Sequence, residues 1–232
     1  DFKTKNDLKG LHPLLREWTE VVHDFCRSSS FSNNPWWFNE RATLSTLAGA
    51  AWRLSGWSAL EEFATQKRGV VPDKVIEDGQ VVRGRCDLYV AHRTVDFAIE
   101  AKQSWQSLTK SAKTQKLKQA MALAKRDAGN LDKDEANNRI GAVFTVPYMA
   151  LRDVSKVDAK GRPVLAPSKV MERVESWLEG QDLGQFDAYA YYFTRRCREF
   201  VGKDGLRVFP GVLMTLARCK KGNYRKRVKK SG

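Results

Sequence analysis

Apolar and polar residues alternate along residues 84–103, and this alternation predicts two neighbouring strands. The first strand is expected over 84–90 and the second over 95–103, with a tight turn at 92–94 between them. A spacing of two is typical of a strand with one buried face. Because side chains two apart share a face, Glu100 and Lys102 should project together. If the strands pair antiparallel, Asp87 can lie beside Glu100.

Four other segments repeat apolar residues at spacings of three and four, which predicts helices. The expected helices span residues 11–26, 39–54, 107–128 and 168–178. Asn39 is a good N-cap for the second helix and Ser168 for the last, because their side-chain oxygens can accept from free backbone N–H groups.

The remaining apolar segments predict further strands. Residues 139–149 form a strongly apolar run and should be a buried central strand, and strands are also expected at 186–194 and 209–217. Residues 57–67 fit either a helix or a strand. Residues 76–82 contain an Asp-Gly signal typical of a hairpin turn. Polar loops are expected at 131–138 and 151–167.

The length of 232 residues favours one domain over residues 1–217. It would consist of the N-terminal helix, a core at about 39–150 and an extension at 168–217. Residues 218–232 would form a basic tail. No apolar run reaches membrane-spanning length, so no membrane association is expected. The four scattered cysteines favour reduced thiols and a cytoplasmic location. No nucleotide-binding, serine-hydrolase or zinc-protease motif occurs.

The net charge of +14 indicates an anionic partner, and nucleic acid is the usual one. Eight positive charges lie in 218–230 with no acid among them, which leaves +6 for the rest of the chain. The alternative is a basic surface that serves solubility. Candidate phosphate contacts lie on the helix expected after the second strand and in the tail. They are Lys110, Lys113, Lys116, Lys118, Arg225, Lys226 and Arg227.

Asp87, Glu100 and Lys102 suit one kind of chemistry if they converge. Two close carboxylates repel each other unless a cation lies between them. Mg²⁺ accepts a few carboxylates and keeps several waters. A neighbouring lysine can orient a water molecule or stabilise negative charge on phosphorus. The alternative is that Asp87 marks a strand edge and that Glu100 and Lys102 form a solvated surface pair.

Asp87, followed by Glu100-Ala101-Lys102 at the end of an apolar strand, resembles the PD-(D/E)xK nuclease superfamily. The resemblance implies a restriction-endonuclease-like α/β fold. That fold has an αβββαβ core with a central mixed sheet flanked by helices, here with an extra C-terminal helix and strands. It also implies that Asp87 and Glu100 hold Mg²⁺, or Mn²⁺ as a substitute. The carbonyl of Ala101 would complete the site and Lys102 would assist the attacking water. The chain departs from the family name at Cys86, which replaces the proline.

Several acids and amides are accessory candidates. Glu40 lies at the start of the helix 39–54, where the family often carries an additional metal-binding acid. The helix dipole alone also favours an acid there. The order of elements in the resembling fold favours a first strand at 57–67. Glu61 or Glu62 would then approach the site, and the alternation does not choose between them. Gln103 directly follows the motif.

The expected function is therefore a metal-dependent nuclease, acting on DNA in preference to RNA. The residues do not distinguish an endonuclease from an exonuclease. Two alternatives stay open: a catalytically inactive nucleic-acid-binding module of the same fold, and a structural or partner-binding protein. A homo-oligomer or a protein partner is compatible with each.

Overall fold

The computed structural model describes residues 2–68, 81–108, 115–131, 136–197, 199–202 and 205–219. Within these residues the protein is an α/β protein with four α-helices and a nine-stranded mixed sheet. The helices are α1 (His12–Ser28), α2 (Glu40–Arg53), α3 (Gln115–Asn130) and α4 (Pro167–Glu179). No helix in this part of the chain combines the length and apolar character that a membrane span requires.

The strands of the large sheet differ widely in length. They are β1 (Phe2–Thr4), β2 (Trp57–Arg68), β3 (Val81–His92), β4 (Val95–Ser107), β5 (Asn138–Ala150), β8 (Ala188–Phe193), β9 (Glu199–Gly202), β10 (Gly205–Val208) and β11 (Gly211–Arg218). Two short strands, β6 (Ser155–Val157) and β7 (Pro163–Leu165), form a separate hairpin. Short 3₁₀ helices include η2 (Pro35–Trp37) and η3 (Leu151–Asp153).

The sheet is built around an antiparallel meander and one crossover. Strands β2, β3 and β4 follow each other antiparallel, and α3 then leads to β5, which runs parallel to β4. This is the one parallel pair among the described strands. The strand order is β1-β8-β11-β5-β4-β3-β2, and β10 joins the end of β5. The longest strands, β2 to β5, therefore form one side of the sheet.

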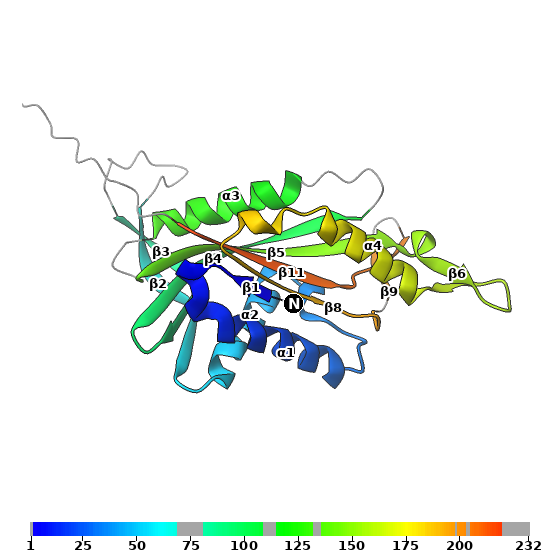
Figure 1. Cartoon of the computed structure of the whole chain (residues 1–232), viewed down its shortest axis with the longest axis horizontal. Helices are drawn as coiled ribbons and strands as arrows, with labels where there is room; N and C mark the ends of the chain where they lie inside the picture. Colours follow the sequence, from blue (N-terminus) through cyan, green and yellow to red (C-terminus); the bar gives the residue numbers. More distant parts are fainter. Residues whose placement is uncertain are drawn as a thin grey trace, which may run out of the picture.

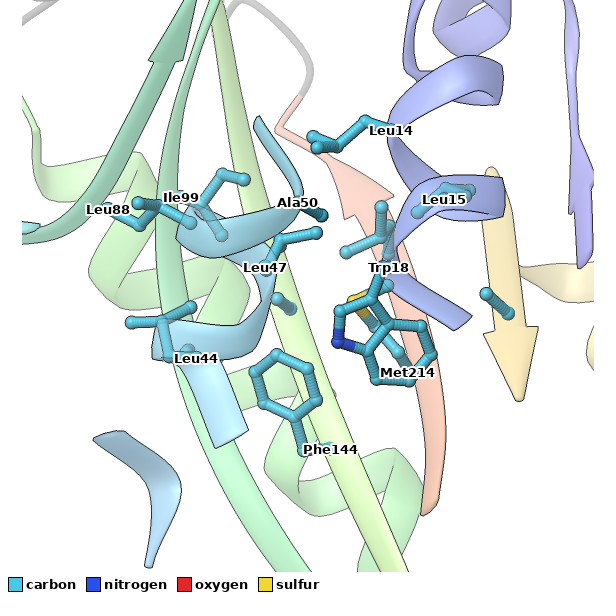
Figure 2. Close-up of a cluster of buried hydrophobic side chains, with 14 of the residues drawn as sticks. Leu14, Leu15, Trp18, Leu44, Leu47, Ala50, Leu88, Ile99, Phe144 and Met214 are labelled. Atoms are coloured by element: carbon cyan, nitrogen blue, oxygen red, sulfur yellow. The ribbon is translucent and has the colours of Figure 1, made fainter. Parts of the chain in front are cut away.

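The helices cover both faces of the sheet in three layers (Figure 1). Helices α1 and α2 lie on one face, and α3 and α4 lie on the other. Figure 2 shows the main core, in which Leu15 and Trp18 of α1 meet Leu47 of α2 above Phe144 of β5 and Met214 of β11. Burial of such side chains contributes about 1.5–3 kcal/mol each, so this face fixes where α2 lies on the sheet.

Most expected elements are confirmed. The predicted helices at 11–26 and 39–54 are α1 and α2, and the Asn39 side chain accepts from Ala42 N at 2.8 Å as an N-cap. The predicted strands at 84–90, 95–103, 139–149, 186–194 and 209–217 are β3, β4, β5, β8 and β11. The ambiguous segment 57–67 is strand β2, which pairs with β3 at every position except Glu62.

Three expectations were wrong in detail. The chain at 107 is still strand, because β4 pairs with β5 as far as Ser107, and Leu108 N donates to Tyr148 O. Ser168 is not a cap: α4 begins at Pro167, whose missing N–H needs no partner at a helix start. The loop expected at 151–167 contains η3 and the β6–β7 hairpin. The hairpin turn expected near residue 78 and residues 132–135 lie outside the described chain.

Candidate active site

The candidate site lies at a fork between β3 and β4, the point where the two strands stop pairing. Their register runs from His92 and Val95 to Leu88 and Ile99 and ends there. One more step would place Asp87 opposite Glu100. Instead, Asp87 Oδ2 accepts a hydrogen bond from Ala101 N at 2.8 Å. The carboxylate thus takes the place of a strand carbonyl and is held at the fork.

Glu100 and Lys102 lie on the same face of β4, as the alternation predicts. Ile99 and Ala101 belong to the core under α1 and α2, whereas Ala98 packs in a cluster on the other face. Glu100 and Lys102 therefore face α3. Glu100 is only 2% exposed and Lys102 is half-buried.

Burial dominates the electrostatics of Glu100. Lys67 Nζ of β2 lies 2.7 Å from Glu100 Oε1, close enough for an ion pair. That oxygen nevertheless has no hydrogen bond of ordinary geometry within the described residues. Burial, and after it the charge of Asp87, raises the pKa of Glu100 to about 7, against the opposing effect of Lys67. The site thus holds an acid that gives up its proton near neutrality.

Lys102 has its own partner on α3. Its Nζ lies 3.0 Å from Asp127 Oδ2. Burial by itself would lower the pKa of Lys102, but the hydrogen bond and charge of Asp127, with Glu40 and Asp87, raise it overall. Burial likewise opposes ionisation of Asp127, yet the ammonium of Lys102 keeps the Asp127 pKa below its ordinary value. Lys102 is therefore a positioned ammonium ion at neutral pH.

Glu40 connects α2 to β4 beside this site. Its Oε2 accepts from Gln103 N at 2.6 Å, while Asn39 caps the helix. Burial raises the pKa of Glu40; the Gln103 hydrogen bond and the charge of Lys102 oppose that change, and Asp87 adds to it. Glu40, Asp87 and Lys102 are thus within electrostatic reach of one another.

The other accessory candidates have structural partners. Gln103 Nε2 donates to Trp36 O at 3.2 Å, on the α2 side of the sheet. Glu61 accepts from Ser45 Oγ of α2 at 2.7 Å. Glu62 falls opposite Asp87 between two paired positions of β2 and β3, with a positive φ of 49°. Its carboxylate forms ion pairs with two arginines, Arg41 at 2.7 Å and Arg85 at 3.3 Å.

The predicted phosphate contacts are placed only in part. Lys116 and Lys118 are exposed on α3. Lys110, Lys113, Arg225, Lys226 and Arg227 lie outside the described residues. Within the described part of the chain, no three His, Cys, Asp or Glu side chains lie together as a ready-made metal site.

Sequence reasoning missed two members of the site, Lys67 and Asp127. Lys67 follows the apolar part of β2, and its side chain crosses Gly84 of β3, where a Cβ would approach it to 2.8 Å. No pattern in the neighbouring sequence predicts that contact. Asp127 could have been noticed, because it is the one acid in the basic segment 107–128 and lies one turn after the apolar residue Ala124 on the helix.

Comparisons of this chain with protein-family models, with curated proteins and with solved structures found no match. Two cavities, lined mainly by residues of α1, α4 and β8 and of the segments that follow α1 and β8, contain no residue of the fork. The carboxylates and lysines of the fork are therefore the groups that indicate its chemistry.

The burial of Glu100 predicts that stability depends on pH. The folded protein binds this proton more tightly than the unfolded chain, because the pKa rises from 4.5 to about 7 on folding. The contribution of Glu100 is therefore full below pH 4.5 and is lost as the pH rises through about 7, by up to about 3 kcal/mol.

This dependence is measured by urea unfolding at pH 5 and pH 8. Glu100→Gln should flatten the change in unfolding free energy between the two pH values. Glu179→Gln, at the exposed end of α4, is the matched control and should keep the wild-type slope. Equal slopes in all three proteins would contradict the assignment to Glu100.

Proposed function

We propose that this protein is a metal-dependent nuclease of restriction-endonuclease-like fold that hydrolyses phosphodiester bonds, with DNA as its preferred substrate. One observation carries the proposal: Asp87 is held by Ala101 N at the point where β3 and β4 separate, next to buried Glu100 and on the strand that carries Lys102. The order α2-β2-β3-β4-α3-β5 supports it, since it matches the αβββαβ core that the resemblance implies.

The residues of the fork fit a magnesium ion. Asp87 and Glu100 would supply the carboxylates, the Ala101 carbonyl a further oxygen, and Glu40 a contact direct or through water. The fit is supported by the charge of Asp87, which helps raise the Glu100 pKa, and by the ammonium of Lys67, a cation that lies 2.7 Å from Glu100 Oε1 where the metal would bind. Mg²⁺ commonly uses one or two carboxylates and completes its shell with waters and phosphate oxygens.

The reaction would be hydrolysis, in which a water oxygen forms a new bond to phosphorus and the bond to the leaving sugar oxygen breaks. A bound Mg²⁺ would supply charge stabilisation and a more acidic water. Lys102 would place its ammonium beside the attacking water and the charge that develops on phosphorus. Asp127 would hold that ammonium in position and Glu40 would fix the β4 backbone at Gln103.

A second candidate function is a nucleic-acid-binding module that does not cleave. It is favoured by the observation that both functional charges of β4 already have partners, Glu100 with Lys67 and Lys102 with Asp127. In that case the ion pairs stabilise the fold, and the basic surface alone binds the phosphate backbone.

The proposal is tested with linear and circular DNA, incubated with the protein in Mg²⁺, in Mn²⁺ and in EDTA. Cleavage that needs the metal supports the nuclease, and cutting of the circle identifies an endonuclease. Tight binding that is equal in EDTA and without cleavage would select the binding module instead. RNA of the same sequence should be cut less efficiently than DNA.

Lys116 and Lys118 are expected to contribute to DNA affinity through phosphate contacts. Their exposed ammonium groups lie on α3, the helix that covers the face of β4 carrying Lys102. Lys116→Gln/Lys118→Gln should weaken binding roughly equally for all sequences. It should also reduce the slope of log affinity against log salt by about 1 to 2, near one unit for each lost phosphate contact.

The measurement is fluorescence anisotropy of labelled duplex DNA in EDTA over a range of salt concentrations. Lys156→Gln, on the β6–β7 hairpin at the far end of the molecule, is the matched control (Figure 1). An unchanged salt slope in the double variant would remove α3 from the DNA-binding surface.

A further inference from the structure

A groove lies at the edge of the sheet, away from the fork. Strand β1 pairs only with residues 188–190 of β8, so among the described strands nothing covers the outer side of residues 191–193. Helices α1 and α4 lie on opposite faces of the sheet near this edge (Figure 1). Two adjoining cavities of about 500 and 470 Å³ occur here and share His23, Tyr192 and Phe193.

One end of the groove is basic. Arg27, Arg195 and Arg196 line the smaller cavity. Arg27 pairs with Asp24 at 2.9 Å. The exposed guanidinium groups of Arg195 and Arg196 form no ion pair with a carboxylate of the described residues. A guanidinium presents several N–H donors in a plane that matches two phosphate oxygens. This end therefore offers two guanidinium groups to an anion.

Aromatic rings line the same cavity. The rings of Phe31 and Tyr192 each lie 5.8 Å from the His23 ring, and Tyr192 Oη is 2.9 Å from His23 Nδ1. Arg196 lies over the Phe31 ring at 5.3 Å. Burial raises the pKa of Tyr192 to about 12, so its hydroxyl keeps its proton at neutral pH. The cavity thus combines flat apolar surfaces with polar groups at their edges.

The backbone at the end of α1 is strained in a way that presents Phe31 to the groove. Ser30 and Phe31 have φ values of 52° and 62°, a left-handed conformation that favours glycine. Phe31 N donates to Cys26 O at 2.7 Å, which fixes this turn. Strained residues of this kind concentrate at binding sites, where the surrounding structure holds them.

We propose that this groove binds a nucleotide, with the base against Phe31 and Tyr192 and the phosphate on Arg195 and Arg196. Inorganic phosphate would use only the guanidinium groups, and an uncharged aromatic molecule only the rings. Aromatic side chains accept any base, because every base has a flat face. Glu20 and Glu175 line the larger cavity and repel phosphate there, which favours a single phosphate group at the basic end.

The groove is connected to the fork through Trp36. The Trp36 ring lies 6.0 Å from that of Tyr192, and Trp36 O accepts from Gln103, whose N–H donates to Glu40. The nucleotide is either free in solution or the end of a bound strand, and the chemistry is the same. The proposal goes beyond the proposed function and does not depend on cleavage.

The test is calorimetric titration of the full chain with adenosine 5′-monophosphate in EDTA, so that no cleavage contributes. We expect saturable binding that weakens at least about tenfold in Arg195→Gln/Arg196→Gln, because the phosphate loses its charged donors. Phe31→Leu should weaken binding of the nucleotide but leave inorganic phosphate unaffected. Arg152→Gln, exposed on η3, is the control and should bind as the wild type does.

Further titrations identify the source of the nucleotide. If a short single strand with a 5′-phosphate competes with the monophosphate and the same strand without the phosphate does not, the groove holds a strand end. If only the monophosphate binds, the groove holds a free nucleotide. Equal affinity in wild type and the double arginine variant, or no saturable binding of either molecule, would overturn the proposal. Unchanged thermal unfolding of the variants shows that they are folded.

Discussion

Asp87→Ala is expected to abolish metal-dependent DNA cleavage, with a rate at least about 10³-fold below that of the wild type. Loss of a partner outside the coordination shell of a metal already costs about 10–100-fold in affinity or activity, and Asp87 would bind the metal itself. Asp87 also accepts from Ala101 N, so its removal frees the β4 backbone at the fork. Lys102→Ala should lower the rate by about 10²–10³-fold, the usual cost of losing one group that stabilises developing charge.

Single-turnover cleavage of linear DNA in saturating Mg²⁺ measures both effects, and DNA affinity is measured separately in EDTA. Lys156→Ala, which removes the same charge on the remote β6–β7 hairpin, is the matched control for Lys102→Ala. Full activity in Lys102→Ala would refute the assigned role of that lysine. Loss of cleavage together with unchanged DNA binding distinguishes catalysis from simple attraction of the phosphate backbone.

Gly141→Ala is expected to destabilise the fold by about 3 kcal/mol and to lower cleavage with it. Gly141 of β5 is the register partner of Glu100 of β4. A Cβ there would lie 2.7 Å from Lys125 N and 2.8 Å from Ala124 C, both backbone atoms of α3. Neither can rotate away, so the helix must shift outward, at the upper end of the usual cost of overpacking. That shift would move Asp127 away from Lys102.

The control residue, Gly129, lies on α3, the helix that a Cβ at Gly141 would contact. Gly129→Ala introduces the same methyl group where a Cβ has nothing within 4 Å, and it should be neutral or stabilising by up to about 1 kcal/mol. Thermal unfolding compares the two variants, and about 3 kcal/mol corresponds to roughly 6–12 °C in a chain of this size. If Gly141→Ala unfolded at the same temperature as Gly129→Ala, close contact between α3 and β5 would not be what holds the helix over the site.

Two ion pairs at the fork affect both the expected loss of cleavage in the Asp87 and Lys102 variants and the expected effect of Gly141→Ala. Lys67 lies at the carboxylate of Glu100, where a cation would bind, and Asp127 holds the ammonium of Lys102. Each pair joins β4 to a different neighbour, Lys67 on β2 and Asp127 on α3. A divalent ion at Glu100 would have to displace Lys67, because both cations compete for the same buried oxygen.

The local parts of this structure could be predicted because they depend on short-range chemistry. Alternation by two along residues 84–103 predicts β3 and β4, since successive strand side chains point to opposite faces. The same rule predicts that Glu100 and Lys102 share a face, as they do. Asn39 caps α2 because a side-chain oxygen satisfies the first N–H groups wherever such a helix begins.

The ends of helices and strands were predicted less well, because they depend on pairing with strands that are distant in the sequence. Residue 107 was expected to begin a helix, but pairing with β5 keeps Ser107 in the strand. Residues 57–67 fit a helix and a strand equally well, and β3 as a partner makes them a strand. A hydrogen-bonded neighbour supplies free energy that a single segment does not contain.

The sequence by itself determined the type of most helices and strands outside residues 57–67, the basic charge, and the carboxylate and lysine motif on β3 and β4. Only the tertiary structure decided which groups meet at the fork. It placed Lys67 at Glu100 and Asp127 at Lys102, and it turned Glu61 and Glu62 toward Ser45 and two arginines. The physical reason is distance along the chain: Lys67 and Glu100, or Glu40 and Gln103, come together only when separate elements pack, and no local pattern records that packing.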